Sequence, residues 1–148
     1  MILILDANIV FSSVLNPKSV IACILFDSEN GIIFIAPSFL KLEIYKHVPR
    51  ICKLTGFNED RIHSLIEFIF SKILFYPDEV IPDFILNHSD EICAKVDPKD
   101  SIYIAFALFF ESKVWSGDKK LINGLKGQGL ALILDSTDVL QLIRSFKK

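Results

Sequence analysis

Two carboxylates of this sequence stand directly beyond short apolar runs, where a side chain can reach a site at the end of a strand. Asp6 follows the wholly apolar run Met1–Leu5, and Asp118 lies three residues past the short run that ends at Trp115. A carboxylate that abuts a buried strand costs free energy unless it has a partner or a purpose. Glu43 and Asp100, each near the start of an expected helix, are two further acids that we expect at the same edge.

Converging carboxylates repel one another, so ionising all of them together requires a cation. Carboxylate oxygens are hard ligands that favour Mg²⁺ or Mn²⁺, whereas zinc favours His or Cys. A site of this kind orients water, lowers its pKa and stabilises charge on a transferring phosphoryl group. The residue types therefore indicate hydrolysis of a phosphodiester, with Asp6, Glu43, Asp100 and Asp118 as metal ligands and catalytic residues.

Each acid except Asp6 also has a purely structural interpretation. Asp100 at a helix start is typical of an N-cap, which would hold its side chain on the backbone. Glu43 alone is typical of a solvated helix face, and Asp118 in Ser-Gly-Asp is typical of a turn. Asp135 also follows a strand, but it precedes Ser136 and reads as turn or cap.

The elements that must position these acids alternate between strand and helix along the chain. Apolar runs predict strands over 1–5, 32–36, 74–76, 114–115 and 130–134. Helical spacing predicts helices over 18–28, from Ser38 as an N-cap, over 58–72, 83–95 and 100–111, and from Ser136 onward. This alternation predicts one α/β domain over residues 1–148, a three-layer α/β/α sandwich with a mainly parallel sheet. In such sheets ligands bind beyond the carboxyl ends of the strands, at a switch in strand order.

Composition limits the possible partners and compartments. The net charge of −2 argues against a protein that coats nucleic acid by bulk electrostatics, although it permits a few local phosphate contacts. The chain is 51% hydrophobic with 13 Phe, which suggests apolar surface covered by a second copy, that is, a homodimer. We find no basic segment before the first apolar run and no apolar stretch long enough for a membrane, so we expect a cytoplasmic protein. The histidines lack ligand spacing and are interpreted as surface or incidental residues: His47, His63 and His88. The cysteines are interpreted as buried, reduced thiols: Cys23, Cys52 and Cys93.

Four motifs, in this order, resemble those of the PIN domain family. They are Leu5-Asp6-Ala7-Asn8 after the first strand, Pro37–Glu43 ending in a helical acid, Asp97-Pro98-Lys99-Asp100 before a helix rich in small residues, and Trp115-Ser116-Gly117-Asp118. The resemblance implies an α/β/α fold and a Mg²⁺- or Mn²⁺-dependent ribonuclease, often dimeric, in a family that includes the VapC-type toxins of toxin–antitoxin pairs. It implies RNA as the substrate and a small antitoxin protein as a possible partner, although the segment 51–96 is longer than in minimal toxins.

The resemblance also assigns roles to individual residues. Asp6, Glu43, Asp100 and Asp118 would form the acidic tetrad, and Asn8 and Ser116 would orient carboxylates or water beside the metal. Asp97 could also reach the site, but Asp100 is preferred because the backbone would hold it. Lys119 is the first candidate for a phosphate contact, followed by Lys120 and Lys41.

Two other functional classes remain open. One is a non-catalytic PIN-like module that binds RNA or a protein partner, and a site that binds no Mn²⁺ in calorimetry would favour it. The other is a phosphatase phosphorylated on the aspartate after the first strand; enzymes of that type place a second acid where this chain has Asn8.

Overall fold

The computed structural model describes residues 1–27 and 29–147 and contains the parallel sheet that the sequence predicts. The strands lie in the order β3-β2-β1-β4-β5, and every neighbouring pair is parallel. Their bounds are Ile2–Leu5 for β1, Ile33–Pro37 for β2, Ile73–Tyr76 for β3, Lys113–Trp115 for β4 and Ile133–Leu134 for β5. The α/β fold class is confirmed.

The central strand β1 is short and entirely apolar because layers of helices cover both of its faces. Leu3, Ile4 and Leu5 are all fully buried, as expected for a parallel strand inside an α/β protein. Leu5 pairs with Trp115, so β1 and β4 end at the same level. The N–H of Asp6 donates to the carbonyl of Trp115 at 3.3 Å and extends this pairing by one residue.

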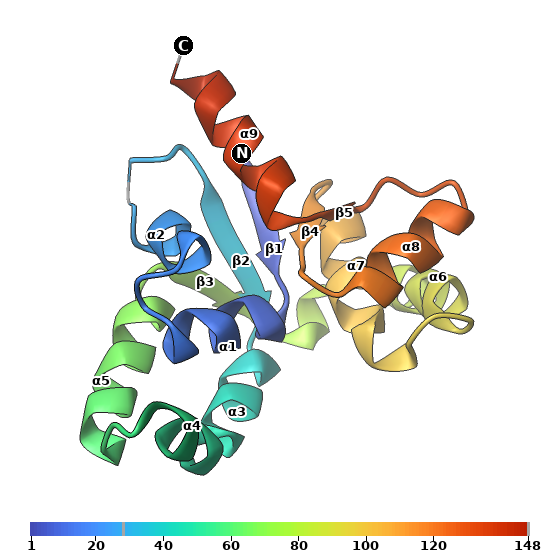
Figure 1. Cartoon of the computed structure of the whole chain (residues 1–148). Coiled ribbons are helices and arrows are strands. Elements are labelled where there is room, and N and C mark those ends of the chain that lie inside the picture. Colours follow the sequence, from blue (N-terminus) through green and yellow to red (C-terminus); the bar gives the residue numbers. More distant parts are fainter. Residues whose placement is uncertain (28, 148) are drawn as a thin grey trace.

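Helices lie on the two faces of the sheet according to the direction in which the chain crosses it. Right-handed crossovers place the helices before β3 on one face and those after β3 on the other, and Figure 1 shows the blue and green helices on one side of the strands and the yellow and orange ones on the other. The first group is α1 (Ala7–Leu15), α2 (Val20–Phe26), α3 (Phe39–Lys46), α4 (Val48–Thr55) and α5 (Glu59–Phe70). The second is α6 (Asp83–Cys93), α7 (Ser101–Phe109) and α8 (Lys119–Gly127), with α7 packed against β1, β2 and β4. The last helix, α9 (Ser136–Phe146), packs on β5, and short 3₁₀ turns occupy Asp78–Val80 and Pro98–Asp100.

The sequence did not predict helices α1, α4 and α8. In α1 and α8 the reason is that the two strand-end acids are also helix caps: Asp6 accepts the N–H of Asn8, and Asp118 accepts those of Lys120 and Leu121. Helix α1 therefore begins one residue after β1, and α8 begins after the three residues that follow β4, where the sequence indicated no helix. In α4, Pro49 occupies the first helical turn, where it costs no hydrogen bond.

Other expected boundaries are corrected by one or more residues. Ser38 makes no side-chain cap, because its backbone is already helical. The helix expected over 18–28 is observed as Val20–Phe26, and its predicted last residue, Ser28, lies outside the described residues. The strand expected over 130–134 is paired only at Ile133–Leu134. The expectation that all three cysteines are buried was wrong, because Cys23 is exposed on α2.

In the described part of the chain, no single helix is long and apolar enough to cross a membrane. Among the described residues, α1 and α2 together have the length and apolar composition of a membrane span, but they are bent by 106° at their junction.

Candidate active site

The candidate site lies where the strand order reverses. From β1 the chain builds outward to β2 and β3, then returns to β4 on the other side of β1. The connections that leave β1 and β4 therefore go to opposite faces, and a crevice forms beyond their carboxyl ends. Asp6 follows β1 and Ser116–Asp118 follow β4, so two of the four predicted motifs meet at this point.

A hydrogen-bond network joins these two strand ends. The hydroxyl of Ser116 donates to Asp6 Oδ2 at 2.7 Å and accepts the N–H of Asp118 at 3.1 Å. The N–H of Asn8 donates to Asp6 Oδ1 at 3.4 Å, while the Asn8 side-chain oxygen accepts the N–H of Gly117 at 3.5 Å. Asn8 and Ser116 thus lie beside Asp6, and both hold its carboxylate in one orientation.

Asp6 is buried, with only 6% of its surface exposed. Burial raises the pKa of its carboxyl group above the ordinary value, and the negative charge of Asp118 adds to this effect. The hydrogen bonds from Ser116 and Asn8 act in the opposite direction, because they stabilise the ionised form. Burial therefore makes the ionised form of Asp6 unfavourable, and hydrogen bonds from Ser116 and Asn8 offset part of that cost.

Asp100 lies among the same negative charges as Asp6, but one of its carboxylate oxygens has no hydrogen-bond donor. Its Oδ2 atom is buried and has no hydrogen-bond partner among the described residues. Burial, as the main cause, raises the pKa of Asp100 from 3.8 to about 7. Neighbouring carboxylates also raise it, namely those of Asp6, Asp97 and Asp118.

The side chains of Asp97 and Asp100 are held differently from what the sequence predicts. We expected the backbone to hold the side chain of Asp100 as a helix cap, but Asp100 makes no cap hydrogen bond. Asp97 is the residue whose side chain is held, because it accepts the N–H of Lys99 at 3.0 Å. The free oxygen belongs to Asp100, so Asp100 remains the better candidate ligand for a different reason.

Glu43 and Tyr103 complete the acidic surroundings. Tyr103 is buried on α7, one helical turn after Asp100, so the two share a face. Burial raises the pKa of the Tyr103 hydroxyl above its usual range, and the carboxylates of Asp6, Asp100 and Glu43 raise it as well. Glu43 therefore reaches the cluster next to Tyr103 and is the most peripheral of the four acids. Sequence reasoning gave Tyr103 no role, although its spacing from Asp100 was a usable signal.

The lysines differ in how closely they approach the acids. The charge of Lys120 lowers the pKa of Asp100, which places Lys120 within electrostatic reach of the cluster. Lys119, the first candidate for a phosphate contact, is exposed at the start of α8. The ammonium group of Lys41 lies over the ring of Phe75, 4.4 Å from its centroid.

The residues fit a divalent cation by their chemistry. The donors are carboxylate oxygens, one of them buried and unpartnered, and their mutual repulsion is what a cation would relieve. Yet across residues 1–27 and 29–147 no three Asp, Glu, His or Cys side chains are grouped closely enough to hold a metal as they stand. The donor set is therefore suitable, and its carboxylates would have to draw together around the ion.

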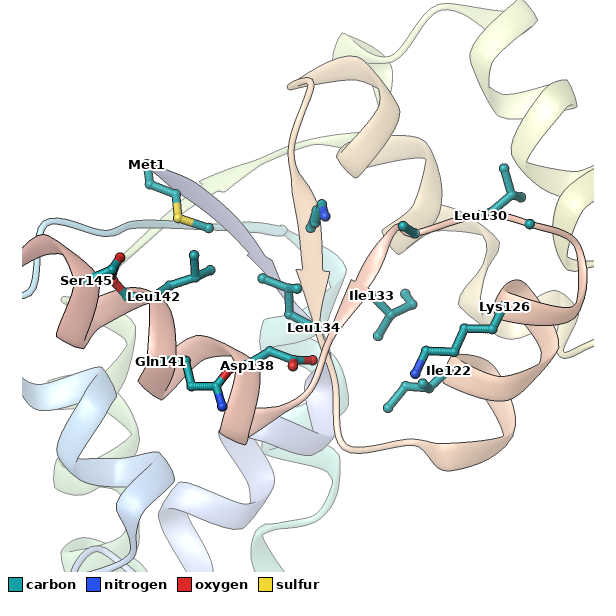
Figure 2. A pocket seen from close by; sticks show the side chains of 13 residues that line it. Met1, Ile122, Lys126, Leu130, Ile133, Leu134, Asp138, Gln141, Leu142 and Ser145 are labelled. Carbon is teal, nitrogen blue, oxygen red and sulfur yellow. Dashed lines mark hydrogen bonds between the residues drawn. The ribbon is translucent and has the colours of Figure 1, made fainter.

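Two cavities lie at different ends of the molecule. The smaller, of about 220 Å³, adjoins the acids and is lined by Ala7, Asn8, Phe11, Glu43, Ile44, His47 and Arg50. The larger, of about 660 Å³, lies between α8, β5 and α9 (Figure 2) and contains none of the site acids. Because Met1 and Lys113 line the larger cavity, it lies toward the amino ends of β1 and β4, away from the strand ends that carry the site. We therefore assign the chemistry to the edge with the smaller cavity.

Comparison with known proteins agrees with this placement. The family model of the PIN domain matches residues 4–140, a span that runs through all four motifs. The chain belongs to the PIN domain family. This is a family of nucleases that generally use divalent metals, so the coarse class of activity, a nuclease, follows from membership.

Solved structures support the same fold. The chain is similar to one in the crystal structure of VapBC2 from Rickettsia felis bound to a DNA fragment from their promoter. The TM-score is 0.68 at 11% sequence identity, and the likeness covers 91% of this chain and 98% of the other. No curated protein matches the chain in sequence. At this identity the structural likeness carries the fold alone.

Proposed function

We propose that this PIN domain is a metal-dependent endoribonuclease that hydrolyses phosphodiester bonds of RNA. The observation that carries the proposal is the unpartnered, buried carboxylate oxygen of Asp100, next to the charges of Asp6 and Asp118 at the reversal in strand order. A buried carboxylate without a donor is destabilising in the isolated protein. Its presence at the one edge where α/β folds bind ligands is explained by a cation.

The chain's own residues divide the work as follows. Asp6, Glu43, Asp100 and Asp118 would hold Mg²⁺ or Mn²⁺, while the Ser116 hydroxyl and the Asn8 N–H orient Asp6 and favour its ionised form. The ion, when bound, supplies positive charge that stabilises the phosphoryl group and favours ionisation of water. Lys120, and beyond it Lys119, would contact the phosphate backbone.

We further propose that the enzyme is the toxin of a toxin–antitoxin pair and forms a homodimer. The similar fold in the VapBC2 structure supports an antitoxin partner. The dimer proposal is supported by exposed aromatic side chains, which lie on several helices and some of which a second copy would cover: Phe68, Phe84, Phe109 and Phe146 are between 38% and 73% exposed.

The test compares two helix-capping acids that follow strands. Asp118→Asn keeps an N-cap, because Asn caps as well as Asp does, but removes the charge that faces Asp6 and Asp100. Asp135→Asn is the matched control, since Asp135 caps α9 in a capping box with Asp138 and lies outside the cluster. We expect Asp118→Asn and Asp6→Asn to abolish Mg²⁺- or Mn²⁺-dependent cleavage of labelled RNA, while Asp135→Asn retains it. Full cleavage by both site variants would reject the proposal.

One observation favours the second candidate, a PIN-like module that binds RNA or a partner without cleaving. The acids are not gathered into a ready metal site in the described residues. Calorimetry with Mn²⁺ separates the two candidates: heat of binding that disappears in Asp100→Asn supports the nuclease, and no binding by the wild-type chain supports the module.

A further inference from the structure

The cavity of about 220 Å³ beside the acids contains a set of residues that metal binding does not require. It lies between α1 and the junction of α3 and α4, helices that pack against one another (Figure 1). One part of its lining, Asn8 and Glu43, belongs to the candidate site. The other part is Phe11, His47 and Arg50, an aromatic ring, an imidazole and a guanidinium.

The ring of Phe11 lies at the centre of this group, with His47 on one side and the guanidinium of Arg50 over it. The rings of Phe11 and His47 meet edge to face, with centroids 5.7 Å apart and planes at 74°. The guanidinium carbon of Arg50 lies 5.8 Å from the centroid of the Phe11 ring. Phe11 and His47 are half-buried and therefore fixed in place, whereas Arg50 is exposed. A cation–π contact at an exposed position is weak, so the guanidinium can leave the ring for a stronger partner.

The same combination of groups is what proteins use to hold single-stranded nucleic acid. Aromatic side chains stack on bases, and positive side chains follow the phosphates. Arginine in particular forms two parallel hydrogen bonds to a phosphate. A volume of about 220 Å³ is below the roughly 300–1,000 Å³ of pockets for drug-sized ligands, so the cavity is small, and we assign to it a single base with its phosphate at the exposed Arg50.

The position of the cavity gives that nucleotide a role. Asn8 lines the cavity and also donates its N–H to Asp6, so an occupant lies directly next to the acids. Glu43, on the side of the cavity toward the acids, repels phosphate, whereas Arg50 attracts it. The phosphate that leads away from the cleaved bond is therefore expected on the Arg50 side.

We propose that this cavity is a nucleotide subsite: Phe11 and His47 take the base, and Arg50 takes the phosphate, of the RNA residue next to the scissile bond. The inference rests on the proposed ribonuclease function and adds a determinant of substrate binding to it. It also gives His47 a place in the site, where the sequence suggested an incidental residue.

The experiment measures binding of the whole chain to a phosphorothioate-linked hexauridylate labelled with fluorescein, by anisotropy with Mg²⁺ in the buffer. The thio linkages keep the charge of the strand and resist cleavage. Phe11→Ala is expected to weaken binding about 5- to 150-fold, the range for loss of one base–aromatic stack. Phe11→Leu keeps the apolar volume and should weaken binding in the same direction, which separates loss of stacking from loss of folding.

Arg50→Gln should weaken binding and also reduce the slope of log affinity against log salt by about 0.7, the value for one phosphate contact to a single strand. Arg61→Gln is the matched control, because the guanidinium of Arg61 also lies over an aromatic ring, Phe57, at 3.7 Å, but outside the cavity. That variant should bind as the wild type does.

Three results would overturn the subsite. Unchanged affinity in Phe11→Leu and Arg50→Gln would reject it while the nuclease proposal stands, provided that cleavage still requires Asp6 and Asp118. An equal loss in Arg61→Gln would show general electrostatics in place of a site. No binding of the hexauridylate by the wild-type chain would reject the subsite, whereas RNA as the substrate is tested separately by the cleavage assay.

Discussion

Replacing Asp100 by Asn should stabilise the metal-free protein at neutral pH, although it removes a residue that we assign to the active site. The reason is that the pKa of Asp100 is raised from 3.8 to about 7 by burial and by neighbouring carboxylates. Between these two values the folded state holds a proton here that the unfolded chain has lost. The free energy of unfolding therefore falls as pH rises through this window, and above pH 7 the full cost is present.

The size of the effect follows from the same two values. At full strength, the difference between 3.8 and about 7 corresponds to roughly 4 kcal/mol. Asp100 is partly exposed to solvent, which screens its charge, so about half of this, ~2 kcal/mol, is the reasonable expectation. For a chain of this length that is a rise in Tm of about 4–8 °C. Asn keeps the shape of the side chain and can donate to nearby carboxylates.

The assay is thermal unfolding followed by circular dichroism in EDTA at a series of pH values from 4 to 8.5. The wild-type Tm should fall as pH rises toward 7, and the Asp100→Asn variant should lose much of that dependence. Asp83→Asn, at an exposed acid that begins α6, is the control and should change Tm little. Adding Mn²⁺ should raise the Tm of the wild type alone. If Asp100→Asn is no more stable than the wild type at pH 8, the account of Asp100 as a strained, unpartnered carboxylate is refuted.

Three further outcomes are expected. Ser116→Ala removes the hydroxyl that donates to Asp6 at 2.7 Å. The free energy of unfolding in urea at pH 7 should fall by about 1.5–3 kcal/mol. An unchanged midpoint would contradict the hydrogen-bond network between Asp6 and Ser116. Gly124→Ala places a Cβ 2.7 Å from a methyl group of Val96, a stiff side chain, and should lower the free energy of unfolding by about 1–3 kcal/mol. Gly127→Ala lies in the same helix with open space around it and should not lower the free energy of unfolding. Light scattering at micromolar concentration should give the mass of a dimer, and a monomeric mass would reject the proposed homodimer.

The sequence predicts best those elements in which a single pattern, such as a continuous apolar run, points to one structure. The apolar runs that became β1 and β2 have no competing interpretation, because helices cover both faces and no polar residue interrupts them. The helices α1 and α8 were missed because Asp6 and Asp118 are helix caps as well as candidate functional acids, and the cap was not considered for either residue. An acid that also caps a helix leaves only a short connection after its strand, one residue after β1 and three after β4.

The nucleotide cavity could not be predicted for a related reason. Its lining comes from α1, α3 and α4, and the sequence did not indicate two of these helices. Phe11 and Arg50 are 39 positions apart, and nothing in their spacing brings them together. The π contact between them exists only because α1 packs across the α3–α4 junction.

The pairing of Asp6 with Ser116 is an intermediate case. In any parallel sheet, neighbouring strands end at the same edge, so a sequence with one acid after each of two strands predicts a shared edge. It does not predict that the two strands are neighbours, since that depends on the order in which the chain fills the sheet. Here β4 was added beside β1 instead of beside β3, and Leu5 and Trp115 fell into register. That register brings the Ser116 hydroxyl within 2.7 Å of Asp6 across 110 residues of chain, and it leaves Asp100, carried in by α7 from one face, as the acid without a donor.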